Sequence, residues 1–587
     1  MKAIRGLKSG KAHGIDGWRY EESKRLPETC IHDLAVILAK GARFGLSKAL
    51  VAAKTTLLAK NPDPKSLHHI RPITVLGVIY RLTGRVIFKQ VVAAWKSSLP
   101  LLISGGLPGR GVKDLACLLK FRIEQAIQNK AQLGGFTLDL KKVFNTFPRW
   151  PVVVETAGSS SMGLRFLVAF LDAYGTTGAP EGDSLSVLAM PALATAFHWS
   201  VANDSVVPHG YADNWGWSTF NFACHRAAFV SVLNFSSSLR LEIDFDKSWH
   251  WSITKDFRNA CLDLAHLFPS GDIPIRVESH VKDSGERFHY DRAIHFGNVK
   301  EKIAEAEARA KRIKSLPLDV QTKASLIQAS IWPMALYSAD TAFLGMTHFQ
   351  TLRSTAFFAF VGKCNFASPW LACFALSKFL ADPLLHVLLS VLRSIKRLLS
   401  LCKEVAFGIL DLAVNFDGSR PFGPASTFKR YLTLVGWDLH VDATLSCPDH
   451  FRINLVDDSA EKICRTFRQA WPTFLVSNLA RKGTGNILPH HSLTPQVLSK
   501  FAPDEQAWLV RNIVGGFQTA ATQKLWDPET PISCPLCGLD DNRPHRRLEC
   551  PKLPDIRANH MEAIDILQNE HPDWVYIPDI PNCPGVP

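Results

Sequence analysis

The sequence predicts an α+β fold whose second half is mainly helical, and three observations lead to this prediction. Apolar residues alternate along GGFTLDL (134–140), as they do in a short buried strand. Residues 209–217 and 239–251 have the same strand character, whereas the apolar spacing becomes helical between 299 and 338. With 587 residues and 47% apolar content, the chain is long enough for two to four domains.

The predicted elements follow one another along the chain. Residues 1–130 combine short extended pieces with a helix over DLACLLKFRIEQAIQ (114–128), where apolar positions recur at helical spacing. A helical block continues to residue 415, and the proline- and glycine-rich DGSRPFGPAS (417–426) is typical of a linker. The tail from 530 onward is rich in Pro, Cys and His and lacks long apolar periodicity.

Charge and cysteine usage restrict the partners and the compartment. The net charge of +14 favours a polyanionic partner such as nucleic acid, although a generally basic surface is the alternative. Thirteen cysteines, mostly scattered singly, indicate a reducing, intracellular location. We expect no secretory signal in MKAIRGLKSGKAHGIDGW. We also expect no membrane span, because charged residues interrupt the most apolar tract, 366–414.

Two aspartates lie in predicted strands and are the first candidates for chemistry. Asp139 ends the strand at 134–140, and Asp213 lies 74 residues later in YADNWGW (211–217), at a predicted tight turn. On neighbouring strands, two carboxylates can hold a pair of divalent metals, and Mg²⁺ suits this role because it keeps positions open for phosphates. The alternative is that each aspartate is a turn or capping residue. The four tryptophans of 215–217 and 249–251 are expected to form one packed face.

Seven segments, taken together and in order, resemble the reverse transcriptase of a non-LTR retrotransposon. They are KAHGIDGW (11–18), LLAKNPDP…HHIRPITVLGVIYRL (57–82), GGLPGRGVKDLACLL (105–119), TLDLKKVFNTFPR (137–149), GAPEGDSLSVLAM (178–190), YADN (211–214) and LEIDFDKSWHW (241–251). Any one of them means little, whereas seven in the order of the family indicate common ancestry. A looser resemblance through SLPLDVQTKASLIQASIWPMALY (315–337) extends the match to roughly residues 8–345.

The resemblance implies a right-hand polymerase with fingers, palm and thumb, a helical C-terminal region and a small CCHC zinc knuckle. It implies fingers over 1–130, a palm with the catalytic motifs over 131–260, and a helical thumb and connection over 290–415. The helical C-terminal region is expected over 427–529 and the zinc knuckle over 530–555. The implied activity is RNA-directed DNA polymerisation in the cell, with the nucleus as the expected compartment.

The resemblance also assigns catalytic roles and partners. Asp139 and Asp213 would be the ligands of two catalytic Mg²⁺ ions, and Lys247 would lie near the leaving pyrophosphate as a proton donor. The partners would be an RNA template, a DNA primer and deoxynucleoside triphosphates. For Lys247, a solvated lysine at a strand end is the alternative reading of the same position.

Five further residues would form the nucleotide pocket by the same resemblance. Lys60 and Arg71 would hold the triphosphate, Arg71 through its planar fork and Lys60 as a point charge. Phe144 would be the aromatic gate that clashes with a ribose 2′-hydroxyl. Gly182 would let the backbone approach the incoming base, beside Glu181, which stands where the family has Gln. Without the motif, the cations would be surface residues and Phe144 a core residue.

The sequence departs from the family pattern in three places, and these departures support a rival reading. Asn214 replaces the second aspartate of the YADD-type box, Glu181 adds a negative charge, and the segment 140–177 is shorter than in the family. The rival is a degenerate, catalytically inactive retroelement protein that only binds nucleic acid. An unrelated zinc-binding interaction protein would require the seven ordered matches to arise by chance.

A zinc site is predicted near the C-terminus. Cys534, Cys537, His545 and Cys550 give the spacing C-x₂-C-x₇-H-x₄-C, which fits one tetrahedral, structural Zn²⁺ of the Cys₃His type. Gly538 follows the second cysteine, as a tight turn requires, and arginines between the ligands suit phosphate contact. The alternative is a loose reduced tail. Such a knuckle after the thumb also occurs in proteins of the resembled family.

Overall fold

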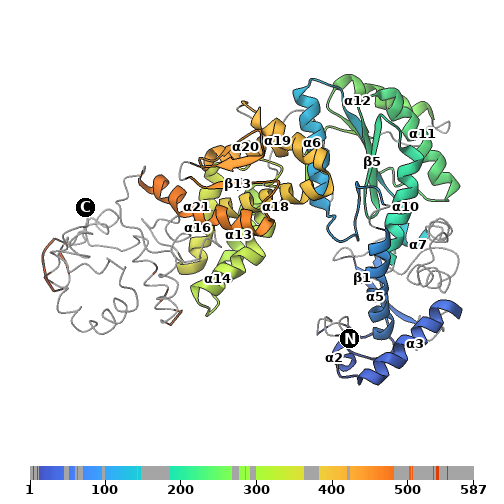
Figure 1. Ribbon diagram of the computed structural model, residues 1–587, viewed down its shortest axis with the longest axis horizontal. Coiled ribbons are helices and arrows are strands. Elements are labelled where there is room, and N and C mark those ends of the chain that lie inside the picture. Colours follow the sequence, from blue (N-terminus) through green and yellow to red (C-terminus); the bar gives the residue numbers. More distant parts are fainter. Residues whose placement is uncertain are drawn as a thin grey trace.

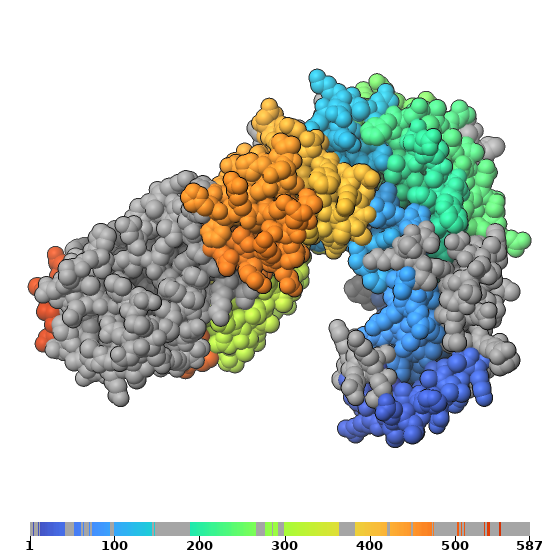
Figure 2. Space-filling model, in the orientation of Figure 1, coloured from blue at the N-terminus to red at the C-terminus, as the bar shows by residue number. Residues whose placement is uncertain are grey.

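The computed structural model describes the chain in separate stretches, which Figure 1 draws in colour. They are residues 4, 10, 12–44, 52–59, 63, 70–95, 99–141, 143–146, 186–267, 276–283, 286–290, 299–362, 382–418, 423–447, 450–480, 502, 503, 506, 510, 533–534, 537–540 and 551–552. Three parts of the chain are named by their residues: the N-terminal arm is 12–95, the sheet lobe is 99–290 and the helical lobe is 299–480. Figure 2 shows that the surface is hollowed between the helical lobe and the N-terminal arm.

Six strands form the sheet of the sheet lobe, in the order β3-β5-β6-β4-β7-β8. The pairs β5–β6, β6–β4 and β4–β7 are antiparallel. At the two edges of the sheet, the short strands β3 and β8 run parallel to their neighbours β5 and β7. The strand predicted at 134–140 is confirmed, and it lies in the middle of this sheet. The bounds are β3 Ile103–Ser104, β4 Gly134–Asp139, β5 Val206–Tyr211, β6 Asn214–Thr219, β7 Trp249–Ser252 and β8 Val277–Glu278.

Helices pack on both faces of the sheet, which confirms the predicted α+β class (Figure 1). Side chains of α10 and α11 share one hydrophobic cluster with β4 and β6, and side chains of α6 share another with β7. A further short helix, α7, directly follows β4. The bounds are α6 Val112–Gln128, α7 Val143–Thr146, α10 Ser186–Val201, α11 Phe222–Ser238 and α12 Lys255–Leu262.

The four strand tryptophans divide between the two faces, so the expectation of one packed face was wrong. Trp215 and Trp217 are buried with α10 and α11, whereas Trp249 and Trp251 are buried with α6. His250 lies between the last two. It and Trp217 are both register partners of Phe136 on β4, so their side chains lie on the same face of the sheet. Because side chains alternate along a strand, the neighbours of His250 point to the opposite face. The predicted alternation within each strand is confirmed, but the register between β6 and β7 that a single packed face would require was wrong.

The two glycines that begin β4 are required by close packing from both sides. A Cβ on Gly135 would lie 2.2 Å from the carbonyl oxygen of Trp217 and 2.5 Å from the Trp251 ring. A Cβ on Gly134 would lie 2.3 Å from the ring of Phe257. No side chain fits at these distances, so the GG pair allows the large aromatic residues to close over the strand.

The N-terminal arm brings the first two resembled segments together. Asp16 accepts a hydrogen bond from the backbone N–H of Val78, at 2.7 Å, where the helix α5 begins. A carboxylate at this place stabilises the helix, because the first N–H groups have no partner within it. The elements of the arm are α2 Tyr20–Ser23, α3 Glu28–Phe44, β1 Ala53–Ala59, β2 Ile70–Leu76 and α5 Val78–Trp95, with β1 and β2 forming an antiparallel hairpin.

The helical lobe packs around one large hydrophobic cluster. Its elements are α13 Val299–Lys314, α14 Val320–Leu326, the π-helical turn Ile327–Ile331, α15 Trp332–Ala335, α16 Met346–Val361, α18 Pro383–Leu401, α19 Lys403–Val414, α20 Pro424–Leu434, β11 Asp438–Leu439, β12 Thr444–Ser446, β13 Arg452–Asn454 and α21 Ala460–Ala480. Within the described ranges, no helix combines the length and the hydropathy that crossing a membrane would require.

Helix α20 begins inside the segment that was expected to be a linker. Pro424, Ala425 and Ser426 are buried, and the carboxylate of Glu124 on α6 accepts hydrogen bonds from the N–H groups of Ala425 and Ser426, both at 2.9 Å. The first turn of α20 is therefore capped by a side chain that lies about 300 residues earlier. Composition alone did not reveal this contact, because Pro and Gly are also common at helix starts.

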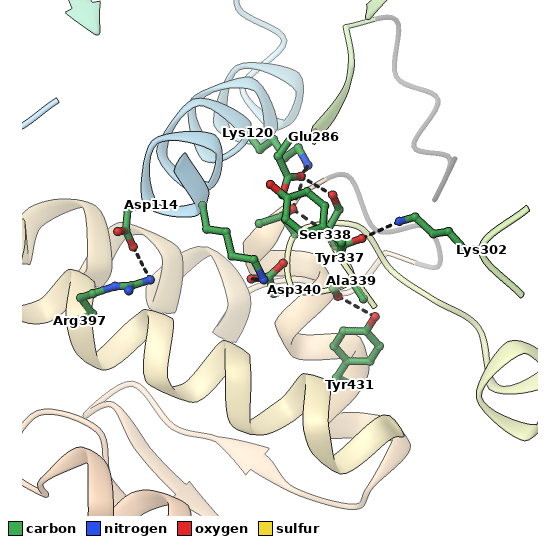
Figure 3. Close-up of polar contacts among 12 residues, drawn as sticks. Asp114, Lys120, Glu286, Lys302, Tyr337, Ser338, Ala339, Asp340, Arg397 and Tyr431 are labelled. Carbon is green, nitrogen blue, oxygen red and sulfur yellow. Dashed lines mark hydrogen bonds and ion pairs between the residues drawn. The ribbon is translucent and has the colours of Figure 1, made fainter. Parts of the chain in front are cut away.

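Polar contacts join α6 both to the strand β10 (Glu286–His289) of the sheet lobe and to the helical lobe, as Figure 3 shows. Lys120 Nζ lies 2.7 Å from Glu286 Oε2, on β10, and donates to Thr341 Oγ1 at 2.9 Å. Near the start of α6, Asp114 pairs with Arg397 on α18 at 2.6 Å. Helix α6 is therefore held both by the sheet that it covers and by the helical lobe.

Candidate active site

Asp213 lies in a turn that other resembled segments hold in place. Ala212 and Asp213 connect β5 to β6, and Ala212 adopts a left-handed φ of 51°. The N–H of Ala212 donates to the carbonyl of Ser104 at 3.2 Å, and the indole N–H of Trp215 donates to the carbonyl of Ala212 at 2.7 Å. A Cβ on Gly105 would lie 2.4 Å from the Ala212 nitrogen. The segment GGLPGRG thus supplies the glycine that the YADN turn requires.

Asp139 lies next to this turn at the end of β4. Its register partner on β6 is Asn214, the residue that follows Asp213. The N–H of Asp139 donates to Ser248 Oγ at 3.0 Å, and this hydroxyl donates to the carbonyl of Asp244 at 2.8 Å. The segments that carry Asp139, Asp213 and Lys247 therefore meet at one end of the sheet.

A lysine and several carboxylates surround Asp139. Lys247 Nζ lies 3.8 Å from Asp139 Oδ2 and 2.5 Å from Asp244 Oδ2. Burial raises the pKa of Asp139 to about 6; Lys247 opposes this rise, and the charges of Asp213, Asp244 and Asp283 add to it. The hydrogen bond to Asp244 raises the pKa of Lys247, so the lysine is charged at neutral pH.

Asp283 brings a carboxylate that sequence reasoning did not identify. It ends β9 (His280–Asp283), which pairs with β10, and its Oδ1 accepts from Asn214 Nδ2 at 3.4 Å. No motif marks this residue, since only the packing of the β9–β10 hairpin brings it near the turn. Asp244 was also missed, although it lies three residues before Lys247 in the same resembled segment.

The donor set at this end of the sheet suits a hard divalent cation. Carboxylate oxygens are the ligands that Mg²⁺ prefers, and it is usually bound by one or two carboxylates together with substrate phosphates. Asp139 has a side chain that is 24% exposed, so it can reach a ligand from solvent. The pKa of Asp139 is raised mainly by burial and to a smaller extent by the neighbouring carboxylates, and a bound cation would favour the ionised form against both.

Asp139→Asn is expected to stabilise the metal-free protein at pH 7.5 and to have little effect at pH 4. The pKa of Asp139 is raised from 3.8 to about 6 in the folded chain, so stability from this group is present below 3.8 and is lost as the pH rises through 6. The upper bound of the gain is about 3 kcal/mol. Thermal unfolding midpoints in EDTA measure it; a midpoint difference that is the same at both pH values contradicts the expectation.

The structure describes only part of the predicted nucleotide pocket. The backbone of Arg71 lies in β2, and the backbone of Phe144 lies in α7. Lys60, Glu181 and Gly182 lie outside the described residues. Of the candidate catalytic residues, Asp139, Asp213 and Lys247 are brought together, whereas the pocket residues remain sequence predictions.

The first half of the predicted zinc site forms a tight turn. Gly538 N–H donates to the carbonyl of Cys534 at 2.8 Å, Cys534 N–H donates to the carbonyl of Leu539 at 2.6 Å, and Gly538 has a φ of 79°. This closed turn carries Cys534, which is buried, and Cys537. His545 and Cys550 lie outside the described residues. The zinc site itself therefore stays a prediction from the spacing of its four ligands.

A second group of metal-ligating side chains lies in the core of the sheet lobe. His225, His250 and Cys261 are buried, and their ligand atoms lie within 4.8 Å of one another, so they could hold a metal ion. Without a metal, hydrogen bonds satisfy both nitrogens of His225 and Nδ1 of His250, whereas Nε2 of His250 is buried and has no hydrogen-bond partner among the described residues. Trp217 Nε1, which can only donate, lies 3.3 Å from His225 Nδ1. His225 must then carry its proton on Nε2, which lies 2.9 Å from His250 Nδ1 and donates to it.

Comparison with known proteins adds little to these observations. No family model matches the chain, and no curated protein matches it. Among solved structures, the chain is similar to an apo telomerase from Candida tropicalis, truncated from its C-terminal domain, with 14% sequence identity and a TM-score of 0.28. The match covers 41% of this chain and 58% of that chain. A likeness at this score is a weak resemblance to a polymerase related to reverse transcriptases and assigns no function.

Proposed function

We propose that this chain is an RNA-directed DNA polymerase of the non-LTR retrotransposon type, which adds deoxynucleotides to a 3′-hydroxyl. The observation that carries the proposal is the meeting of Asp139, Asp213 and Lys247, whose segments are far apart in sequence, at one end of the sheet. The order of the seven resembled segments supports the same assignment. In this proposal, the fingers are 1–130 and the palm is 131–260.

The residues at the end of the sheet would divide the chemistry among them. Two Mg²⁺ ions, when bound, would activate the 3′-hydroxyl and stabilise the leaving pyrophosphate. Asp139 and Asp213 would hold them through carboxylate oxygens, and a pKa of about 6 leaves Asp139 ionised at neutral pH. Lys247, oriented by Asp244 at 2.5 Å, would hold a proton for the pyrophosphate oxygen.

The remaining proposed roles follow the resemblance alone. Lys60 and Arg71 would bind the triphosphate, Phe144 would exclude a ribose, and Gly182 beside Glu181 would border the incoming base. The helical thumb and connection (290–415), the helical C-terminal region (427–529) and the knuckle (530–555) would contact template and primer. One structural Zn²⁺ would be held by the ligands Cys534, Cys537, His545 and Cys550.

A degenerate protein that only binds nucleic acid is the second candidate. Asn214 favours it, because an amide at this position keeps one oxygen ligand and loses the charge of the aspartate. The short segment 140–177 favours it as well, because a change in length affects the geometry of the site rather than one ligand.

Primer extension on an RNA template tests the proposal. The purified chain with Mg²⁺ should extend an annealed DNA primer with deoxynucleotides, and EDTA should stop the reaction. Absence of extension by a folded chain that binds the template–primer would favour the degenerate protein.

Asn214→Asp is expected to raise Mg²⁺ or Mn²⁺ affinity by about 3- to 10-fold, because a carboxylate adds charge beside Asp213. It should also lower the stability of the metal-free protein, since the donation from Asn214 to Asp283 becomes a repulsion between carboxylates. Mn²⁺ titration followed by electron paramagnetic resonance measures the affinity, with Asn214→Ser as the matched control. An unchanged affinity would place the defect in the segment 140–177.

A further inference from the structure

A groove lined by arginines lies on the helical lobe, away from the proposed active site. Helices α18 and α21 pack against each other (Figure 1), and the groove beside them has a volume of about 570 Å³. Its described lining is Arg393 from α18 and, from α21, Ala460, Glu461, Cys464, Arg465, Arg468 and Gln469. The α21 residues recur at spacings of three and four, so they form one face of that helix.

Among the described residues, the three arginines of this groove have no acidic partner within ion-pair distance, unlike their neighbours. On the same two helices, Arg397 pairs with Asp114 at 2.6 Å and Lys462 pairs with Asp458 at 2.5 Å. Lys396 donates to the carbonyl of Val456 at 2.6 Å. In the part of the chain that the structure describes, no carboxylate lies within ion-pair distance of the three groove arginines.

The groove therefore carries an excess of positive charge. Three arginines and the single Glu461 leave a net charge of +2 (3 − 1) on its described lining. Arg465 and Arg468 are three residues apart on one helix, where like charges repel. A hollow with one sign of charge concentrates the field and attracts counter-ions. Such an arrangement is stabilised when an anion occupies it.

We propose that this groove binds the phosphate backbone of a single nucleic-acid strand, at a site separate from Asp139 and Asp213. The planar guanidinium fork matches phosphate oxygens, which suits arginine for this role. The volume lies in the range of ligand sites rather than that of a single ion. The described lining has no aromatic side chain on which bases could stack, so binding is independent of base sequence.

The identity of the strand as an RNA template rests on the proposed function, whereas phosphate binding does not. A concave site suits a strand better than it suits a flat membrane surface. An acidic membrane is the alternative partner. To separate the two, the experiment includes vesicles of phosphatidylcholine with one quarter phosphatidylserine beside single-stranded RNA and DNA of equal length.

The experiment compares two variants of equal charge. One variant changes Arg393, Arg465 and Arg468 to Gln, and the control changes Lys300, Lys311 and Lys403 to Gln. All six residues are exposed on the helical lobe, and each variant lowers the net charge from +14 to +11 (14 − 3). Binding of a fluorescent 20-nucleotide RNA is measured against salt concentration in EDTA. The salt slope should fall by about 2 in the groove variant, at about 0.7 per lost phosphate contact, and by less than half of that in the control.

Equal losses in both variants would assign the binding to overall charge and overturn the proposal, as would an unchanged slope in the groove variant. The proposal would also be overturned if the groove variant lost vesicle binding while its RNA binding persisted. Thermal unfolding of both variants establishes that they are folded. Because binding is measured without metal and should persist in Asp139→Asn, a failure of polymerisation and a failure of the groove proposal give different results.

Discussion

Asp213→Ala is expected to abolish RNA-templated primer extension, with a loss well beyond the 10- to 100-fold that removal of an outer-shell partner of a metal site costs. Asp139→Asn should have the same effect. Each change removes one of the two carboxylates to which the metal ligation is assigned. Asn at position 139 keeps the shape of the side chain, so its effect reports charge and ligation rather than packing.

The matched control for these variants is Asp246→Ala. Asp246 is exposed and lies in the same segment as Asp244 and Lys247, yet the charges that contribute most to the pKa shift of Asp139 do not include it. Its removal should leave extension within about twofold of the unaltered chain, as for most exposed positions. Mn²⁺ titration of all variants separates lost ligation from lost template binding. Equal extension by Asp213→Ala and the unaltered protein would contradict the mechanism.

Asp382→Ala is expected to lower the free energy of unfolding of the helical lobe by about 3–5 kcal/mol. Asp382 and Arg353 are both fully buried and form a two-fold contact, with Nε and Nη2 each 3.1 Å from a carboxylate oxygen. Asp382 also accepts from the N–H groups of Leu384 and Leu385 at the start of α18. Its removal leaves a buried guanidinium without this carboxylate and the helix start without its cap.

Two comparisons define this effect. Asp319→Ala removes a cap from α14 at a half-buried position, where Asp319 accepts an exposed hydrogen bond from Thr322 N–H at 2.9 Å, and should cost about 1 kcal/mol. The double change Arg353→Met with Asp382→Ala should recover part of the loss, because no charge is then left buried. Urea unfolding followed by circular dichroism measures all three. A loss for Asp382→Ala no larger than that for Asp319→Ala would argue against a buried pair.

Much of the local structure could be predicted because it depends on neighbouring residues. Alternation along GGFTLDL predicted β4, and the helical spacing over 114–128 predicted most of α6. The face on which the tryptophans lie could not be predicted in the same way. Alternation shows that the side chains of one strand point to two faces. The register between β4 and β7 decides which side chains of β7 lie on the same face of the sheet as a given side chain of β4.

The sequence by itself determined the α+β class, the central strand and the identity of Asp139, Asp213 and Lys247 as candidates, since these rest on local periodicity and on the order of segments. Only the tertiary structure decided what lies around them. Asp283 beside Asn214, the chain from Trp217 through His225 to His250, and the groove between α18 and α21 join residues from separate elements. Such contacts arise from the burial of apolar faces far apart in the chain, and no local pattern encodes them.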